Sequence, residues 1–139
     1  MRKGSNSSGL GSVIQDCKGK VLAFSYSRIN GSVVSDLGQL LALRDGLLLA
    51  NRINIPVSIA EVSSPSVVSS LSSLDRNLGD NHFIVNDVKA LFSFVGINLC
   101  QASSYKGNSL ARNLASLAFS SSREFVWLDP SLCLSFFAV

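Results

Sequence analysis

The sequence predicts an α/β domain in which a mixed β-sheet is flanked by helices. Three observations carry this prediction: an opening pair of short strands about a glycine-containing turn, a long apolar helix after it, and strands that then alternate with helices. The chain has 139 residues, which suits one domain. We expect residues 1–9 to be a polar N-terminal remnant or linker and residues 10–139 to form the domain.

The opening pair of strands is predicted at about residues 13–14 and 21–29. Residues 16–20 between them supply turn-forming side chains and Gly19. Along 21–29, alternate residues differ in character, with Leu22, Phe24 and Tyr26 on one side. This pattern is typical of a β-hairpin, and Asn30-Gly31 ends its second strand.

The remaining elements follow from helical periodicity and from capping residues. Ser35 is a suitable N-cap for a mostly buried helix at about 36–53, and Asp36 favours the positive end of its dipole. Ser64 and Pro65 are typical of a second helix start. The other expected elements are a strand at 55–61, a helix at 82–94, a strand at 95–102, a helix from Asn108 to about 120, and a short helix start at Asp129-Pro130 after the apolar residues 126–128. The predicted order up to residue 120 is β-β-α-β-α-α-β-α.

Composition excludes several functional classes. The first eight residues lack the apolar stretch of a signal peptide, and no apolar run is long enough for a membrane span. His82 is the only histidine, which argues against a zinc site and against Cys/His catalysis. Cys17, Cys100 and Cys133 are widely spaced, so we expect small buried residues in a reducing, intracellular compartment. A net charge of +3 is compatible with nucleic-acid binding but too small to indicate it alone.

Several segments, read in order, resemble the ribonuclease H-like domains of plants, a type-1 family also found at the end of non-LTR retroelement reverse transcriptases. The resemblance covers about residues 11–139. The matching segments are 11–16 (GSVIQD) with 19–22 (GKVL), 40–47 (LLALRDGL), 57–61 (VSIAE) with 66–68 (SVV), 106–108 (KGN) with 110–111 and 114–115, and 126–128 (VWL).

This resemblance implies a five-stranded mixed sheet, three antiparallel strands followed by two parallel ones, with helices on both sides. It also implies hydrolysis of the RNA strand of an RNA–DNA hybrid by two Mg²⁺ ions that four carboxylates hold. Carried over residue by residue, the acid of the first helix falls on Gln39, the acid after the fourth strand on Ser63, and the acid near the last helix on Arg112. Glu61 is a surviving acid beside Ser63. We therefore expect hydrolysis to be lost and no cofactor to be bound.

The family's first strand, which carries another acid, has no counterpart because only residues 1–9 precede the hairpin. That strand sits in the middle of the family's sheet, and residues 1–9 contain no β-branched or aromatic residue to replace it. Three outcomes stay open. The hairpin pairs directly with the strand at 57–61, or a sheet edge is left open, or the chain is a truncated copy of a longer protein.

The expected partner is RNA or an RNA–DNA hybrid, bound weakly, with no membrane association and with protein partners undetermined. The residues selected for nucleic-acid contact are basic, aromatic or amide side chains: Arg76, Tyr105, Lys106, Asn108 and Arg112. The alternative hypothesis is a protein-interaction domain or a truncated retroelement-derived remnant with no role in nucleic-acid binding.

Overall fold

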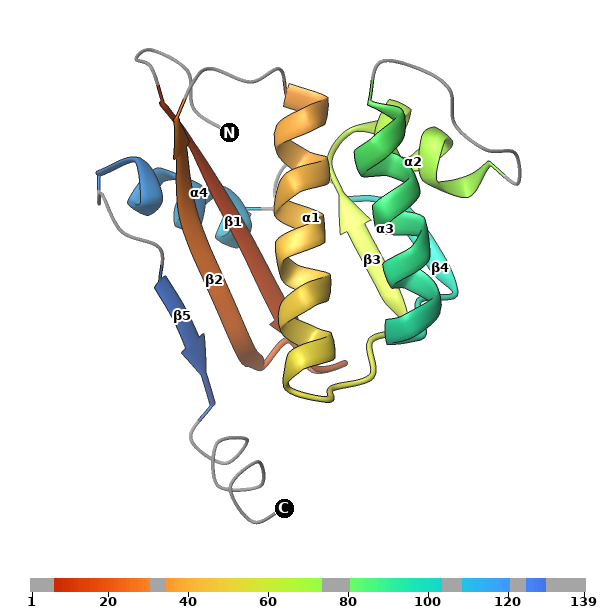
Figure 1. The fold of residues 1–139 in the computed structure, drawn as a ribbon. Helices are drawn as coiled ribbons and strands as arrows, with labels where there is room; N and C mark the ends of the chain where they lie inside the picture. The colour runs from red at the N-terminus through yellow and green to blue at the C-terminus, as the bar shows by residue number, and fades with distance from the viewer. Residues whose placement is uncertain (1–6, 31–34, 74–80, 104–108, 121–124, 130–139) are drawn as a thin grey trace.

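The computed structural model describes residues 7–30, 35–73, 81–103, 109–120 and 125–129. Within these ranges the chain forms, in order, β1 (Ser7–Gln15), β2 (Val21–Asn30), α1 (Ser35–Arg52), β3 (Ile59–Val62), α2 (Pro65–Ser72), α3 (His82–Val95), β4 (Leu99–Ala102), α4 (Ser109–Ser120) and β5 (Phe125–Leu128) (Figure 1). The predicted α/β class and the predicted order through α4 are confirmed.

β1 and β2 form the predicted antiparallel hairpin, with Ser12 opposite Ser25 in the register. The Asp16 carboxylate closes the turn, because its Oδ1 accepts hydrogen bonds from the backbone N–H of Lys18 and of Lys20, both at 2.9 Å. Gly19 adopts a φ of 84°, a left-handed conformation that glycine reaches without steric cost. The turn residues thus fix the hairpin register.

β5 adds a third antiparallel strand on the other side of β2, so this sheet has the order β1-β2-β5. Trp127 stacks on Phe24 of β2 with ring centroids 5.4 Å apart. Sequence analysis assigned no strand to residues 126–128, because their partner strand β2 lies far away in the sequence. The short helix start expected at Asp129-Pro130 lies mostly outside the described residues.

The two faces of β1 are covered by different helices. Gly11 lies against α4 so closely that a Cβ atom there would clash with the backbone oxygen of Ala111. Its neighbour Ser12 faces the other way, and its hydroxyl donates a hydrogen bond to the backbone oxygen of Ala42 in α1. Since successive side chains point to opposite faces of a strand, α1 and α4 lie on opposite faces of this sheet.

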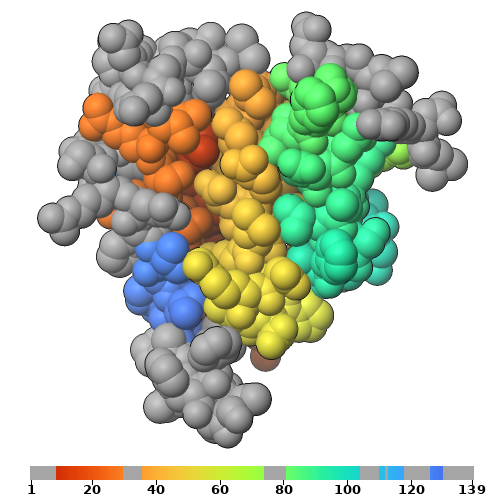
Figure 2. All heavy atoms as spheres, in the orientation of Figure 1, coloured from red at the N-terminus to blue at the C-terminus, as the bar shows by residue number. Residues whose placement is uncertain are grey.

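α1 occupies the middle of the molecule. In Figure 2 it runs down the visible face between β2 on one side and α3 on the other. Its inward residues are almost fully buried, with Leu40 and Leu49 2% exposed. They pack with Ala23 of β2, Val62 of β3 and Val88 of α3 in one hydrophobic core. α1 is therefore the element that joins the antiparallel sheet to the rest of the fold.

β3 and β4 form a separate parallel pair, with Glu61 opposite Gln101. β3 begins at Ile59 and not at 55. Pro56, which precedes it, has no N–H to donate to a ladder. Ala60 and Val62 point into the core, whereas Ile59 and its register partner Leu99 are each 46% exposed on the opposite face.

The described strands therefore form two sheets, one antiparallel and one parallel, and β1 does not pair with β3. Direct pairing of the hairpin with the strand at 57–61, one of the three outcomes left open by the sequence, does not occur among the described strands. The edges of β1 and β3 face each other instead.

Two capping predictions can be checked. Ser64 is the N-cap of α2 as predicted, with its hydroxyl accepting from the Val67 N–H at 3.4 Å. The proposed cap Asn108 lies outside the described residues.

The cysteine prediction fails in part. Cys17 is exposed in the hairpin turn, so the expectation that it is buried is wrong. Cys100 is half-buried in β4, and burial raises the pKa of its thiol. Cys133 lies outside the described residues. Among the helices of the described ranges, none is long and apolar enough to cross a membrane.

Candidate functional site

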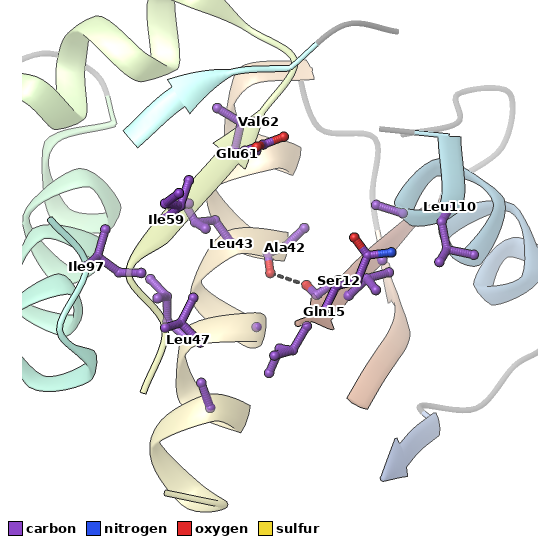
Figure 3. Close-up of a pocket in the computed structure, with 18 of the residues that line it drawn as sticks. Ser12, Gln15, Ala42, Leu43, Leu47, Ile59, Glu61, Val62, Ile97 and Leu110 are labelled. Carbon is purple, nitrogen blue, oxygen red and sulfur yellow. Dashed lines mark hydrogen bonds between the residues drawn. The ribbon is translucent and has the colours of Figure 1, made fainter. Parts of the chain in front are cut away.

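A cavity of about 900 Å³ lies between the facing edges of β1 and β3. We call it the slot. Residues 9–17 of and after β1 and residues 55–62 leading into and along β3 form two of its walls. Inward residues of α1, including Ala42, Leu43 and Leu47, form a third, and Leu110, Ala111 and Ala115 of α4 complete it (Figure 3).

A polar cluster lies at the carboxyl end of β3. The backbone N–H of Ser64 donates a hydrogen bond to Oε1 of Gln39 at 3.0 Å. This bond holds α1 against the first residues after β3, so Gln39 lies next to the half-buried Ser63 in space. The structure thus brings together two of the positions that the family resemblance implied. They contribute a neutral amide and a hydroxyl.

Asp36 supplies the only described carboxylate in this cluster. Both of its oxygens accept hydrogen bonds from serine hydroxyl groups. Ser64 Oγ donates to Asp36 Oδ1 at 2.8 Å, and Ser66 Oγ donates to Asp36 Oδ2. Asp36 therefore fastens the start of α2 to the first turn of α1. Sequence analysis assigned Asp36 a favourable position on the helix dipole, but its contacts with the α2 start could not be read from the sequence.

Glu61 lies on the other side of the same strand end. Gln101 Nε2 donates a hydrogen bond to Glu61 Oε1 at 2.9 Å, across the β3–β4 register. Glu61 also lines the slot with Gln39. The role of Gln101 was missed, and only knowledge of the parallel register would have pointed to it.

The remaining predicted site residues are placed less fully. Arg112 belongs to α4, directly after the slot residue Ala111, and its side chain is not among those described. Arg76, Tyr105, Lys106 and Asn108 lie outside the described residues. The structure therefore brings Gln39, Ser63 and Glu61 to one strand end and leaves the other predicted contacts untested.

The described donors do not fit a pair of Mg²⁺ ions. Mg²⁺ requires hard oxygen ligands, chiefly carboxylates. Here the Gln39 oxygen already accepts from a backbone N–H, the Asp36 oxygens accept from two hydroxyls, and Glu61 binds Gln101. In the part of the chain that the structure describes, no three Asp, Glu, His or Cys side chains come together as a metal-binding group.

The arrangement of strands and helices is similar to that of ribonuclease H. Ribonuclease H1 from Halobacterium salinarum NRC-1 has a similar fold, with a TM-score of 0.69 and 18% identity over 86% of this chain and 92% of that one. The N-terminal RNase H domain of a Mycobacterium tuberculosis protein, solved as a fusion with maltose-binding protein, gives a TM-score of 0.64 and 20% identity over 84% and 92%.

A comparison of the sequence with protein families identifies the family of this chain. Residues 1–118 match the reverse transcriptase-like family, and the chain belongs to that family. No curated protein sequence matches it. The ribonuclease H-like resemblance drawn from the motifs is thereby confirmed.

Proposed function

We propose that this domain binds nucleic acid through its ribonuclease H fold and does not hydrolyse it. The observation that carries the proposal is the hydrogen bond from the Ser64 N–H to Gln39 Oε1 at the carboxyl end of β3. At this point the family resemblance calls for a metal-binding carboxylate, and the chain has an amide oxygen engaged by its own backbone. Hybrid ribonucleases of this fold usually depend on Mg²⁺, and the residues present offer it a poor ligand set.

The charge of the site supports the same proposal. Gln39 and Ser63 are neutral, and Arg112 adds a cation near the position of a third family acid. A cation favours a phosphate and disfavours a divalent metal ion. With Arg76, Tyr105, Lys106 and Asn108 it would form a surface for the backbone and bases of RNA or an RNA–DNA hybrid, in an intracellular setting.

Cleavage is tested with an RNA–DNA hybrid in Mg²⁺ and in Mn²⁺. The expected result is no cleavage above background for the unaltered chain. The variant Gln39→Glu/Ser63→Asp/Arg112→Asp, which restores carboxylates at three positions, measures how far charge alone limits the reaction. Robust cleavage by the unaltered chain that Glu61→Gln abolishes would contradict the proposal.

Binding is tested by the salt dependence of hybrid affinity. The expected logarithmic slope is negative, and the double variant Lys106→Ala/Arg112→Ala should reduce its magnitude by about one for each phosphate that is no longer neutralised. Lys18→Ala is the matched control, because Lys18 lies exposed in the hairpin turn. Equal slopes for all three proteins would remove these residues from the binding surface.

One observation favours the alternative of a protein-interaction domain. Phe83 and Phe94 of α3 are 75% and 78% exposed, and their spacing of eleven residues places them on one helix face. Exposed aromatic patches often mark contact sites for other proteins. Weak, salt-insensitive nucleic-acid binding, together with capture of a partner that Phe83→Ser/Phe94→Ser abolishes, would favour this function.

A further inference from the structure

The slot presents the backbone edges of two strands to a shared space. Ser58 and Val62 direct their carbonyl oxygens to β4, where they accept hydrogen bonds from the backbone of residues 98, 99 and 103. Because backbone groups alternate along a strand, those of Ile59 and Glu61 point to the opposite edge, into the slot. On the other wall, β1 pairs with β2 alone among the described strands.

The two strands run in opposite directions. β1 runs toward the hairpin turn, and β3 runs away from the end of the molecule where that turn lies (Figure 1). One extended segment lying between them would be antiparallel to one edge and parallel to the other. Both arrangements satisfy backbone hydrogen bonds. Such an occupant would also join the two sheets into one, which is the mode of recognition known as β-strand addition.

The lining selects the chemistry of the occupant. It is largely apolar, with α1 on one face and α4 on the other (Figure 3). Among the described lining residues the charged ones are Asp16 and Glu61, and both are acidic. An uncharged, apolar occupant therefore suits the described lining of the slot. A strand covered on both faces reads as a nearly continuous apolar run.

The chain contains such a segment beyond β5. Residues 134–139 (LSFFAV) carry no charged side chain and no proline, so every residue can donate to a neighbouring strand. Phe136 and Phe137 would point to opposite faces of a strand, as an occupant enclosed by two helices requires. The six residues match the length of the wall formed by residues 57–62.

The path to the slot is short. Asp129 is held at the hairpin end of the antiparallel sheet, where its N–H donates to the Leu22 oxygen at 2.7 Å and its carboxylate pairs with Lys20 Nζ at 3.5 Å. Asp16, at the slot mouth, is hydrogen-bonded to Lys20 in the same turn. Three strand spacings of about 4.8 Å separate the β5 position from the slot. The five residue steps from Asp129 to Leu134 span up to about 18 Å.

We propose that residues 134–139 dock in the slot of the same molecule as an additional strand, antiparallel to β1 and parallel to β3. The segment would enter beside Cys17 and run toward Glu61. This inference goes beyond the proposed nucleic-acid binding and does not depend on it. It gives the facing strand edges a partner and covers apolar side chains of α1 and α4.

The test is amide hydrogen exchange of β3, measured by NMR for the full chain and for a chain ending at Pro130. We expect the Ile59 and Glu61 amides to be protected in the full chain and to lose at least about tenfold in protection on truncation. Ala60 is the internal control, because its N–H faces β4 and should keep its protection. Ile59 and Glu61 amides that exchange freely in the full chain, beside a protected Ala60, would overturn the proposal without any variant.

Two full-length variants cover the case in which the truncated chain fails to fold. Phe136→Asp and Phe137→Asp should each release the Ile59 and Glu61 amides, whereas Ser131→Asp, outside the docked segment, should not. Unchanged exchange in both phenylalanine variants contradicts docking. Sedimentation measures the mass: a concentration-dependent dimer that the truncation abolishes would assign the slot to the tail of a second copy and overturn docking within one molecule.

Discussion

The antiparallel sheet and the parallel pair contrast in how they are held. β1 and β2 are nine and ten residues long and are joined by one tight turn, so their pairing is local in sequence. β3 and β4 have four residues each, and α2 and α3 lie between them in the sequence, so their pairing is not local. The antiparallel sheet lies between two helices, whereas the parallel pair leaves Ile59 and Leu99 half exposed. The comparison indicates that the parallel pair depends on α1 and its neighbours, whereas the hairpin is specified by its own sequence.

The strongest way to break this contrast is to weaken α1. Leu40→Ala removes a side chain that is 2% exposed in the shared core, and we expect a loss of about 2–5 kcal/mol in the free energy of unfolding. Trp127 fluorescence reports the antiparallel sheet, and far-UV circular dichroism reports the helices. Both transitions should shift together, since α1 packs on both parts. Leu48→Ala, at a position 47% exposed, is the control. A Trp127 transition that keeps its midpoint would show that the two parts unfold independently.

A change confined to the antiparallel sheet sharpens the contrast. Gly11→Val places side-chain atoms where the α4 backbone already lies, and overpacking of this kind costs about 1–3 kcal/mol. Thermal unfolding measures the loss. Gln15→Val, at an exposed position of the same strand, should change stability far less. If Gly11→Val is as stable as the unaltered chain, α4 does not pack on β1 as described.

The polar cluster supports the parallel side through one cap. Ser64→Ala removes the N-cap of α2 and a hydrogen bond to Asp36, with an expected cost of about 1 kcal/mol. Denaturant unfolding measures the cost, with the exposed Ser72→Ala as a matched control. Asp36→Ala and the double variant complete a double-mutant cycle, and simple additivity of the two single effects would contradict a coupled cluster.

The smallest expected effect concerns Cys100 in β4. Burial raises the pKa of its thiol above the ordinary value of 9.0, so the folded chain keeps a proton that the unfolded chain releases near that pH. Stability should therefore be independent of this group below that pH and should fall as pH rises above it. The measurement is urea unfolding between pH 7 and pH 10 for the unaltered chain and for Cys100→Ala. Parallel pH profiles for the two proteins would contradict the shift.

The sequence predicted best the elements whose signals are local. The Asp16–Lys20 turn, the apolar face of α1 and the Ser64 cap were all readable, because each depends on neighbours within a few residues. β5 was missed because its partner strand β2 lies far away in the sequence. The division into two sheets was left open, since the choice between pairing β1 with β3 and leaving an edge open depends on contacts distant in sequence.

In the candidate site, too, the contacts between residues distant in the sequence could not be predicted. The resemblance located Gln39 and Ser63, and the structure places them at one strand end. The bonds that occupy Gln39, Asp36 and Glu61 come from Ser64, Ser66 and Gln101, which lie 25 to 40 residues away along the chain. No spacing in the sequence could identify those partners.

The hydrogen bond between Gln39 and the Ser64 N–H has a consequence for how this protein can change. Gln39, where the family resemblance implies a metal-binding acid, anchors the backbone of Ser64. Gln39→Glu would keep the acceptor, but a cation and the Ser64 N–H would then compete for one oxygen. Cation binding at this oxygen would therefore loosen the link between α1 and the start of α2 and trade against stability. The contact therefore couples the side chain at position 39 to the stability of the junction between α1 and α2.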